Sequence, residues 1–172
     1  FHLAALIGIP YSYISPTAYV KTNVEGTLNV LEASRNLKIK QILVTSTSEV
    51  YGTAKKQKLN EEDKLVAQSP YAATKISADQ LALSFFKSFN LPVKIVRPFN
   101  VYGPRQSSRA IIPTILSQAL SGKKIITLGN KNSIRDFTYV KDVCSAFEKI
   151  YQSKKFLGQV VNIGSDQEIS IK

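Results

Sequence analysis

Short apolar segments alternate with amphipathic segments along the chain, and this alternation restricts the fold more than any other feature. Strand-like apolar runs lie at residues 1–7, 40–45, 93–98, 124–128 and 159–164. Helical patterns lie between several of them. Elements that alternate in this way build a parallel sheet with helices on both faces. The sequence therefore predicts an α/β fold with a doubly wound, Rossmann-like parallel sheet.

Start signals and periodicity place the helices. Ser15-Pro16 and Ser69-Pro70 each put a capping serine before a proline at the first helical position. The second helix should run to about Phe89, and later helices are predicted over residues 110–120 and 140–151. The first helix should present one apolar stripe, made of Val20, Val24, Leu28 and Leu31.

Composition and charge narrow the classes of function. The 172 residues, 44% hydrophobic, suit about one domain with a real core. The net charge is +11, but the lysines are dispersed, which favours solubility and attraction of an anionic ligand over nucleic-acid binding. No apolar run is long enough for a membrane span. One cysteine, Cys144, provides neither a disulfide nor a metal cluster, so we expect a reducing cytoplasm and no metal.

Tyr71 and Lys75 stand one helical turn apart in SPYAATK, on one face of the predicted helix. A free tyrosine has a pKa near 10. An ammonium at about 6 Å would lower that pKa by about 2 units, toward a value useful for a general base. On many helices the same spacing only reflects a packed tyrosine and a solvated lysine.

A second polar segment leaves the sheet close to this pair. Thr47, Ser48 and Glu49 follow the strand at 40–45 directly, and binding sites in doubly wound sheets gather at the carboxyl ends of strands. Local loop capping by the hydroxyls and a solvated glutamate are the simpler interpretations. Together with Tyr71 and Lys75, the segment indicates a catalytic site.

Six segments along the chain are characteristic together: HLAA (2–5), TNVEGTLNVLEA (22–33), TSTSEVYG (45–52), SPYAATK (69–75), RPFNVYGPRQ (97–106) and RDFTYVKDV (135–143). With these segments in the family's order, the chain resembles the extended short-chain dehydrogenase/reductase family, and within it the nucleotide-sugar 4,6-dehydratases. The opening AALIGIPYSYISP is similar to dehydratases of legionaminic-acid-type pathways.

The resemblance implies a domain division and a missing segment. Residues 1–100 would form part of an NAD(P)-binding domain. Residues 101–172 would form part of a substrate-binding region with returning Rossmann elements, after a break near Val101–Ser108. Family members begin with a strand and a G-x-x-G-x-x-G turn that binds the cofactor pyrophosphate. The sequence has no such turn, so we expect it to be a fragment of a longer, homodimeric enzyme.

The resemblance also implies roles for the candidate residues. Tyr71 would take the proton of the sugar C4 hydroxyl while hydride passes to NAD (NADP is an alternative), with Lys75 and Thr47 assisting. Glu49 would then remove the C5 proton before water is lost. Where dehydratases of deoxythymidine-diphosphate-glucose carry aspartate, this chain has Ser48, so the general acid at C6 stays open.

The remaining contacts implied by the resemblance are to the cofactor and the substrate. Asn100 would contact a nucleotide-sugar, and Arg105 and Arg135 would lie near its diphosphate, which suits a guanidinium fork. Asn23 would support the site structurally, and His2 is given no catalytic role. The cofactor would lie against Leu3, Ala4, Ala5, Thr45, Tyr71, Lys75 and Pro98.

Three other functions remain open at this point. A decarboxylase of the uridine-diphosphate-glucuronate type shares the C4 oxidation and then loses carbon dioxide. A 4-epimerase needs Thr47 and Tyr71 but little from Glu49. A noncatalytic interaction module could use the same fold.

We predict that this chain by itself binds NAD weakly or not at all, because it lacks the glycine-rich turn that binds pyrophosphate. Isothermal titration of NAD into the purified chain measures this affinity. A dissociation constant of a few micromolar or tighter would contradict the prediction.

Overall fold

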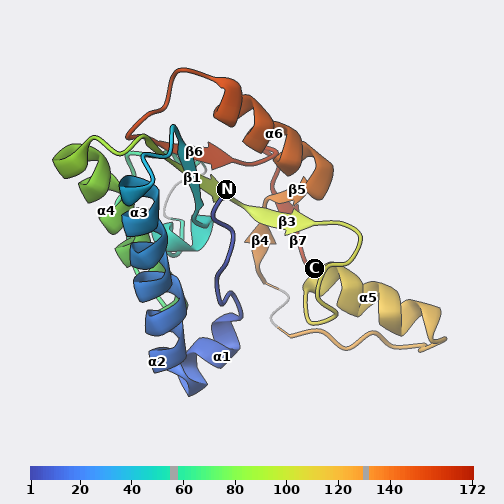
Figure 1. The fold of residues 1–172 in the computed structure, drawn as a ribbon. Coiled ribbons are helices and arrows are strands. Elements are labelled where there is room, and N and C mark those ends of the chain that lie inside the picture. The colour runs from blue at the N-terminus through green and yellow to red at the C-terminus, as the bar shows by residue number, and fades with distance from the viewer. Residues whose placement is uncertain (55–57, 130–131) are drawn as a thin grey trace.

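A three-stranded parallel sheet forms the centre of the computed structural model, which describes residues 1–54, 58–129 and 132–172. The strand order is β1-β2-β6, and both pairings are parallel. Helices α3 and α4 cover one face and α6 covers the other (Figure 1). The predicted doubly wound α/β fold is confirmed.

The elements follow one another in the order that Figure 1 colours from blue to red. Here η1 is a π-helix and η2 a 3₁₀-helix. The bounds are α1 Ile9–Ile14, α2 Pro16–Tyr19, η1 Val20–Glu25, α3 Gly26–Asn36, β1 Ile42–Thr45, η2 Ser48–Tyr51, α4 Pro70–Phe89, β2 Val93–Pro98, β3 Asn100–Tyr102, α5 Ile111–Leu120, β4 Ile134–Arg135, β5 Phe137–Tyr139, α6 Val140–Gln152, β6 Val160–Ile163 and β7 Ile169–Ser170.

Alternate residues of the strands supply two separate apolar clusters, as the two-residue period of a strand requires. The cluster under α3 and α4 contains Ile42, Val44, Val93 and Ile95 with Leu31, Ala82, Phe85 and Leu91. The cluster under α6 contains Leu43, Val96 and Ile163 with Val143, Phe147 and Ile150. Burial of both faces explains why these strands are continuous apolar runs in the sequence.

Two basic side chains of β2 are buried and anchor the covering helices. Lys94, on the α6 side, is fully buried, and its Nζ donates to the carbonyls of Ile150 (2.7 Å) and Ser153 (2.5 Å) at the end of α6. Helix ends leave such carbonyls without partners, so the ammonium caps the helix. Arg97, three residues later in β2, points to the other face of the sheet and forms an ion pair with Asp79 of α4.

The Asp79–Arg97 pair lies entirely inside the protein. Asp79 is 0% and Arg97 2% exposed. Asp79 Oδ2 accepts from Arg97 Nε at 3.0 Å, from Arg97 Nη2 at 2.9 Å and from the Ser46 hydroxyl at 2.9 Å. Burial raises the pKa of the Asp79 carboxyl, and the Arg97 guanidinium and the Ser46 hydroxyl oppose that shift. The pair joins α4 to the sheet.

Two predicted strands do not form. In residues 1–7 only His2 pairs with the sheet, through a parallel bridge to Val44. Further on, the side-chain amide of Asn23 binds both the N–H and the C=O of Leu6, at 2.8 and 2.9 Å. Residues 124–128 contain no strand, and the Gln118 amide binds both backbone groups of Thr127. In each case a side chain replaces a neighbouring strand.

The first helical region also differs from its prediction. A helix does begin at Pro16, but the Ser15 side chain makes no capping hydrogen bond, and α1 precedes it unpredicted. The π-helical turns of η1 then rotate the helix face. Val20 is consequently 50% exposed, whereas Leu31 is fully buried. The other helices and the strands β1, β2 and β6 lie where the sequence places them.

The second half of the chain carries small two-stranded sheets beside the main one. Strands β3 and β5 pair in parallel, and β4 and β7 pair antiparallel. None of the described helices is long and apolar enough to cross a membrane. Helix α6 and strand β6 return to the main sheet. The division of the chain into two parts at residues 101–108 stays a prediction.

Removing the Asp79 charge should destabilise the fold strongly. We expect Asp79→Asn to lower the free energy of unfolding by about 3–5 kcal/mol, because it leaves the Arg97 guanidinium buried without a counter-ion. Urea unfolding measures the change. Glu148→Gln, on the exposed side of α6, is the control and should stay within about 0.5 kcal/mol of the wild type. Equal stabilities for the two variants would contradict the assignment.

Candidate active site

The segment after β1 turns sharply and presents two polar side chains to an open cleft. Thr47 Oγ1 accepts from the Glu49 N–H at 3.2 Å and so caps η2. The next two residues, Val50 and Tyr51, are buried. Ser48 and Glu49, on the other side of η2, line the cleft. The expected loop capping by Thr47 and the exit of this segment at the strand's carboxyl end are both observed.

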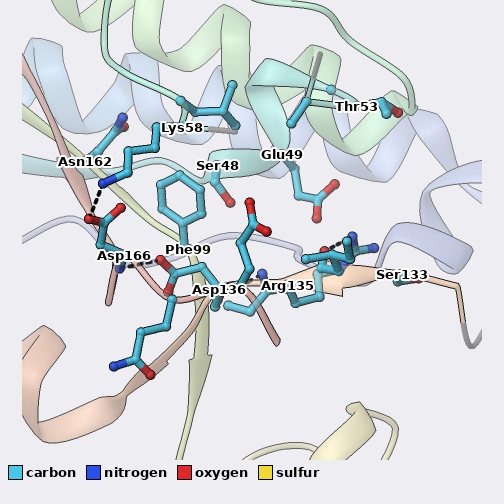
Figure 2. A pocket seen from close by; sticks show the side chains of 18 of the residues that line it. Ser48, Glu49, Thr53, Lys58, Phe99, Ser133, Arg135, Asp136, Asn162 and Asp166 are labelled. Atoms are coloured by element: carbon cyan, nitrogen blue, oxygen red, sulfur yellow. Dashed lines mark hydrogen bonds and ion pairs between the residues drawn. The ribbon is translucent and has the colours of Figure 1, made fainter. Parts of the chain in front are cut away.

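The cleft has a volume of about 810 Å³. It brings together Ser48, Glu49, Asn100 and Arg135, which the sequence analysis assigned separately to catalysis and to substrate binding. Figure 2 shows Ser48 and Glu49 on one side and Arg135 and Asp136 facing them. Within the described ranges, no group of three or more His, Cys, Asp or Glu side chains is arranged to hold a metal ion.

Tyr71 and Lys75 lie at the start of α4, whose first turn is capped by Ser69 Oγ accepting from the Ala72 N–H at 3.1 Å. The side chains are almost fully buried, with 6% and 5% exposure. Lys75 Nζ donates to the Thr45 carbonyl at 2.6 Å. Burial lowers the pKa of the Lys75 ammonium, and the Asp79 carboxylate opposes this. The helix thus holds both side chains beside the end of β1.

The pKa of Tyr71 corrects one expectation. Burial raises it to about 12, with further increases from the negative charge of Glu49 and from Tyr19 and Asp79, while a hydrogen bond with Thr47 lowers it. The sequence predicted a net lowering by Lys75. Loss of hydration outweighs that effect, and the ammonium is engaged with the Thr45 carbonyl. Helix α4 packs against η2 and so brings Tyr71 close to residues 47–49.

The residues expected at the cofactor lie beside the carboxyl ends of β1 and β2, whose last residues are Thr45 and Pro98. Leu3 is 62% exposed, Ala4 is exposed, and Ala5 and Pro98 are half-buried. The Thr45 hydroxyl is buried without a hydrogen-bond partner among the described residues. A partly exposed segment, an unpaired hydroxyl and an ammonium form a set of groups that fits a polar cofactor.

Arg105 is the one assigned substrate residue away from the cleft. It is exposed in the turn after Gly103 and has a left-handed backbone, with φ of 68°. It does not line the cleft that contains Asn100 and Arg135. Its role as a diphosphate contact therefore stays a prediction.

Sequence reasoning missed the carboxylate that organises one wall of the cleft. Asp136 accepts from the N–H of Ser165 at 2.9 Å and of Asp166 at 2.9 Å, and from the Ser165 and Thr138 hydroxyls. Its backbone carbonyl accepts from Asn100. Only the tertiary structure brings residues 164–166 within reach of this carboxylate.

It also missed a buried chain of hydrogen bonds formed by Asp79, Arg97, Tyr51 and Asn162. One signal was present. Asp79 lies one helical turn after Lys75 and two turns after Tyr71, on the same face of α4. A carboxylate at that position of a buried face requires a cationic partner.

Comparisons with known proteins identify the family of the chain. The family model described as GDP-mannose 4,6 dehydratase matches residues 1–172. The chain belongs to the NAD-dependent epimerase/dehydratase family, the extended short-chain dehydrogenases/reductases. The resemblance seen in the sequence is confirmed at this level, and the assignment to legionaminic-acid pathways stays a prediction.

Relatives of two activities are similarly close. The dTDP-D-glucose 4,6-dehydratase of Dictyostelium discoideum is 37% identical over 180 residues, covering 98% of this chain and 41% of the relative. The structure of UDP-glucuronic acid 4-epimerase from Bacillus cereus, in complex with UDP-glucuronic acid and NAD, matches with a TM-score of 0.93 and 34% identity, over 99% of this chain and 55% of that one.

A dehydratase structure matches equally well. DesIV, a dTDP-glucose 4,6-dehydratase from Streptomyces venezuelae with NAD bound, has a TM-score of 0.92 and 28% identity, over 98% of this chain and 52% of that one. The chain thus spans about half the length of the relatives it matches. The comparisons establish the family and leave the specific reaction open.

From the raised pKa of Tyr71 we predict how the stability of the fold changes at alkaline pH. The folded state holds this proton more tightly than the unfolded state (about 12 against 10.0), so stability falls as the pH rises above about 10. Between about pH 8 and pH 11 the wild type should lose about 1.4 kcal/mol more than Tyr71→Phe. Urea unfolding at both pH values measures the difference. Tyr151→Phe, at a partly exposed tyrosine of α6, should behave as the wild type; an equal loss in Tyr71→Phe would refute the shift.

Proposed function

We propose that the protein is a nucleotide-sugar 4,6-dehydratase, which oxidises C4, eliminates water across C5 and C6, and returns hydride to C6. The observation that carries this proposal is the carboxylate of Glu49 in the same cleft as Asn100 and Arg135. Elimination needs a base at C5, whereas oxidation at C4 alone does not. Helix α4, which carries Tyr71, packs against η2, so the proposed C4 base lies near the segment that carries Glu49.

We propose NAD as the cofactor, since solved relatives bind it; NADP is the alternative. Lys75, the Thr45 hydroxyl, which has no partner among the described residues, and residues 3–5 would hold it, with Pro98 at the end of β2. When bound, it supplies a reversible hydride acceptor that is positively charged in its oxidised form. The sequence contains no G-x-x-G-x-x-G turn, so no residue of this chain is assigned to the pyrophosphate.

Two residues of the chain remove protons in this mechanism, Tyr71 at the C4 hydroxyl and Glu49 at C5. Tyr71 takes the proton from the C4 hydroxyl, with Thr47 hydrogen-bonded to the phenol. Because burial holds the Tyr71 pKa at about 12, the phenol releases its proton at neutral pH only when a positive charge stabilises the phenolate. Glu49 removes the C5 proton, which the C4 ketone acidifies. Ser48 or Glu49 itself then delivers a proton to the leaving C6 hydroxyl.

Substrate binding rests on polar groups across the cleft. Arg135 provides a guanidinium fork for the diphosphate, and Asn100 provides an amide for the sugar nucleotide. We propose a substrate from pathways of the legionaminic-acid type, on the resemblance of residues 4–16. We also propose that the full-length protein is a homodimer in the cytoplasm.

A 4-epimerase is the second candidate. The similarity to the Bacillus cereus epimerase, with a TM-score of 0.93, favours it. An epimerase uses Thr47, Tyr71 and Lys75 in the same way but makes little use of Glu49. The decarboxylase and the noncatalytic module are further outcomes that the following experiment identifies.

Glu49→Gln separates these functions in the full-length protein. We predict that the variant still reduces the bound cofactor when given substrate, but forms 4-keto-6-deoxy product about 10²–10⁴-fold more slowly, because only elimination requires the carboxylate. A panel of nucleotide-sugars is tested in heavy water, where the wild type should add one solvent deuterium at C5. Glu148→Gln, on the exposed face of α6, should match the wild type.

Mass spectrometry of the products decides among the alternatives. A C4 epimer of unchanged mass, formed equally by wild type and Glu49→Gln, would establish the epimerase instead. Loss of carbon dioxide from a glucuronate substrate would establish the decarboxylase. No reaction and no cofactor reduction with any nucleotide-sugar would support the noncatalytic module.

A further inference from the structure

The Tyr51 hydroxyl connects the segment that carries Glu49 to the centre of the protein. The side chain is 3% exposed. Its oxygen accepts from Arg97 Nη1 at 2.9 Å and donates to Asn162 Oδ1 at 2.8 Å. The Arg97 guanidinium carbon also lies 5.0 Å from the centre of the Tyr51 ring. Both hydrogen-bond partners belong to strands of the main sheet, β2 and β6.

The position of this hydroxyl is set from outside its own loop. Asp79 holds Arg97 through two N–H groups, and the parallel pairing of β2 with β6 places Arg97 opposite Asn162. The two groups that meet the hydroxyl are therefore fixed to the sheet and to α4. Asp79 Oδ1 and Asn162 Nδ2 are buried without a hydrogen-bond partner among the described residues, but the bonds that the network does make restrict the position of the Tyr51 hydroxyl.

Backbone contacts around Tyr51 hold the turn that also contains Glu49. The two residues lie in the single turn η2. The Val50 carbonyl accepts from the Val66 N–H at 2.8 Å. Gly52 has φ of +67°, and a Cβ there would lie 2.8 Å from the Val66 carbonyl oxygen. The turn is thus anchored at Val50, Tyr51 and Gly52. Glu49 is held in it through its backbone: its N–H donates to Thr47 Oγ1 at 3.2 Å, and its carbonyl accepts from the Gly52 N–H at 3.2 Å.

We propose that Tyr51 is a positioning residue, whose hydroxyl holds η2 so that the Glu49 carboxylate meets the substrate in the cleft. This inference rests on the proposed dehydratase function for its catalytic consequence, but the structural part is independent of it. Tyr51 itself does not line the cleft. Its effect therefore passes through Glu49 and falls on elimination, leaving oxidation at C4 to Tyr71.

Tyr51→Phe tests the proposal in the full-length protein, since it keeps the ring and removes only the hydroxyl. Hydrogen exchange measured by mass spectrometry should become about 5-fold faster or more in peptides covering residues 47–52, with residues 70–89 unchanged. Product formation relative to cofactor reduction should fall about 10- to 100-fold, as expected for a misplaced catalytic group, with KM within about 3-fold of the wild type. Tyr151→Phe on α6 is the matched control and should change neither measurement.

Asn162→Ala provides a second variant in case loss of the Arg97 acceptor prevents folding of Tyr51→Phe. It removes one partner of the hydroxyl at a half-buried position, and should shift both measurements in the same direction by a smaller factor. In whichever variant folds, unchanged exchange in residues 47–52 would overturn the proposal. Faster exchange with a wild-type ratio of product to reduced cofactor would also overturn it, because Tyr51 would then be only structural.

The failure of the proposed function is recognised separately. If the wild type forms no 4-keto-6-deoxy product from any nucleotide-sugar, the dehydratase assignment falls. Hydrogen exchange in the variants then decides alone whether Tyr51 positions η2.

Discussion

The buried Asp79–Arg97 ion pair is the interaction on which the site depends. It joins the long helix α4 to the central strand β2 with both charges out of water. Breaking such a pair by removing one partner is costly, because the remaining charge cannot regain its hydration. Arg97 also donates to the Tyr51 hydroxyl, which in turn donates to Asn162. One electrostatic contact thereby sets α4, η2 and β6 relative to one another.

The two segments of the proposed site differ in burial. Around Tyr71 burial raises the pKa to about 12 and so keeps the phenol protonated until a positive charge is close. Glu49, by contrast, lies in the open cleft with Arg135. Under the proposed mechanism, Tyr71 and Glu49 remove two protons from one substrate in turn. Helix α4, which carries Tyr71, packs against η2, which carries Glu49.

The two strand predictions that failed share one physical cause. Residues 1–7 and 124–128 have apolar patterns typical of strands, but a strand needs a partner for its backbone groups. At Leu6 and Thr127 the partner is a side-chain amide, from Asn23 and Gln118. Hydrophobic periodicity carries no information about such long-range capping. The π-helical turns of η1, which turn Val20 outward, are equally invisible to a pattern that assumes regular helix geometry.

The sequence by itself determined the α/β class, the central strands, the helix carrying Tyr71 and Lys75, and the placement of Ser48 and Glu49 at a strand end. These follow from local periodicity, capping and the rule that parallel strands share an edge. Only the tertiary structure decided which groups meet. It joined Asn100 and Arg135 to Glu49, left Arg105 outside the cleft, and paired Asp136 with residues 164–166. It also reversed the expected pKa shift of Tyr71, because loss of hydration depends on everything packed around a group, whereas spacing along a helix reports only one neighbour.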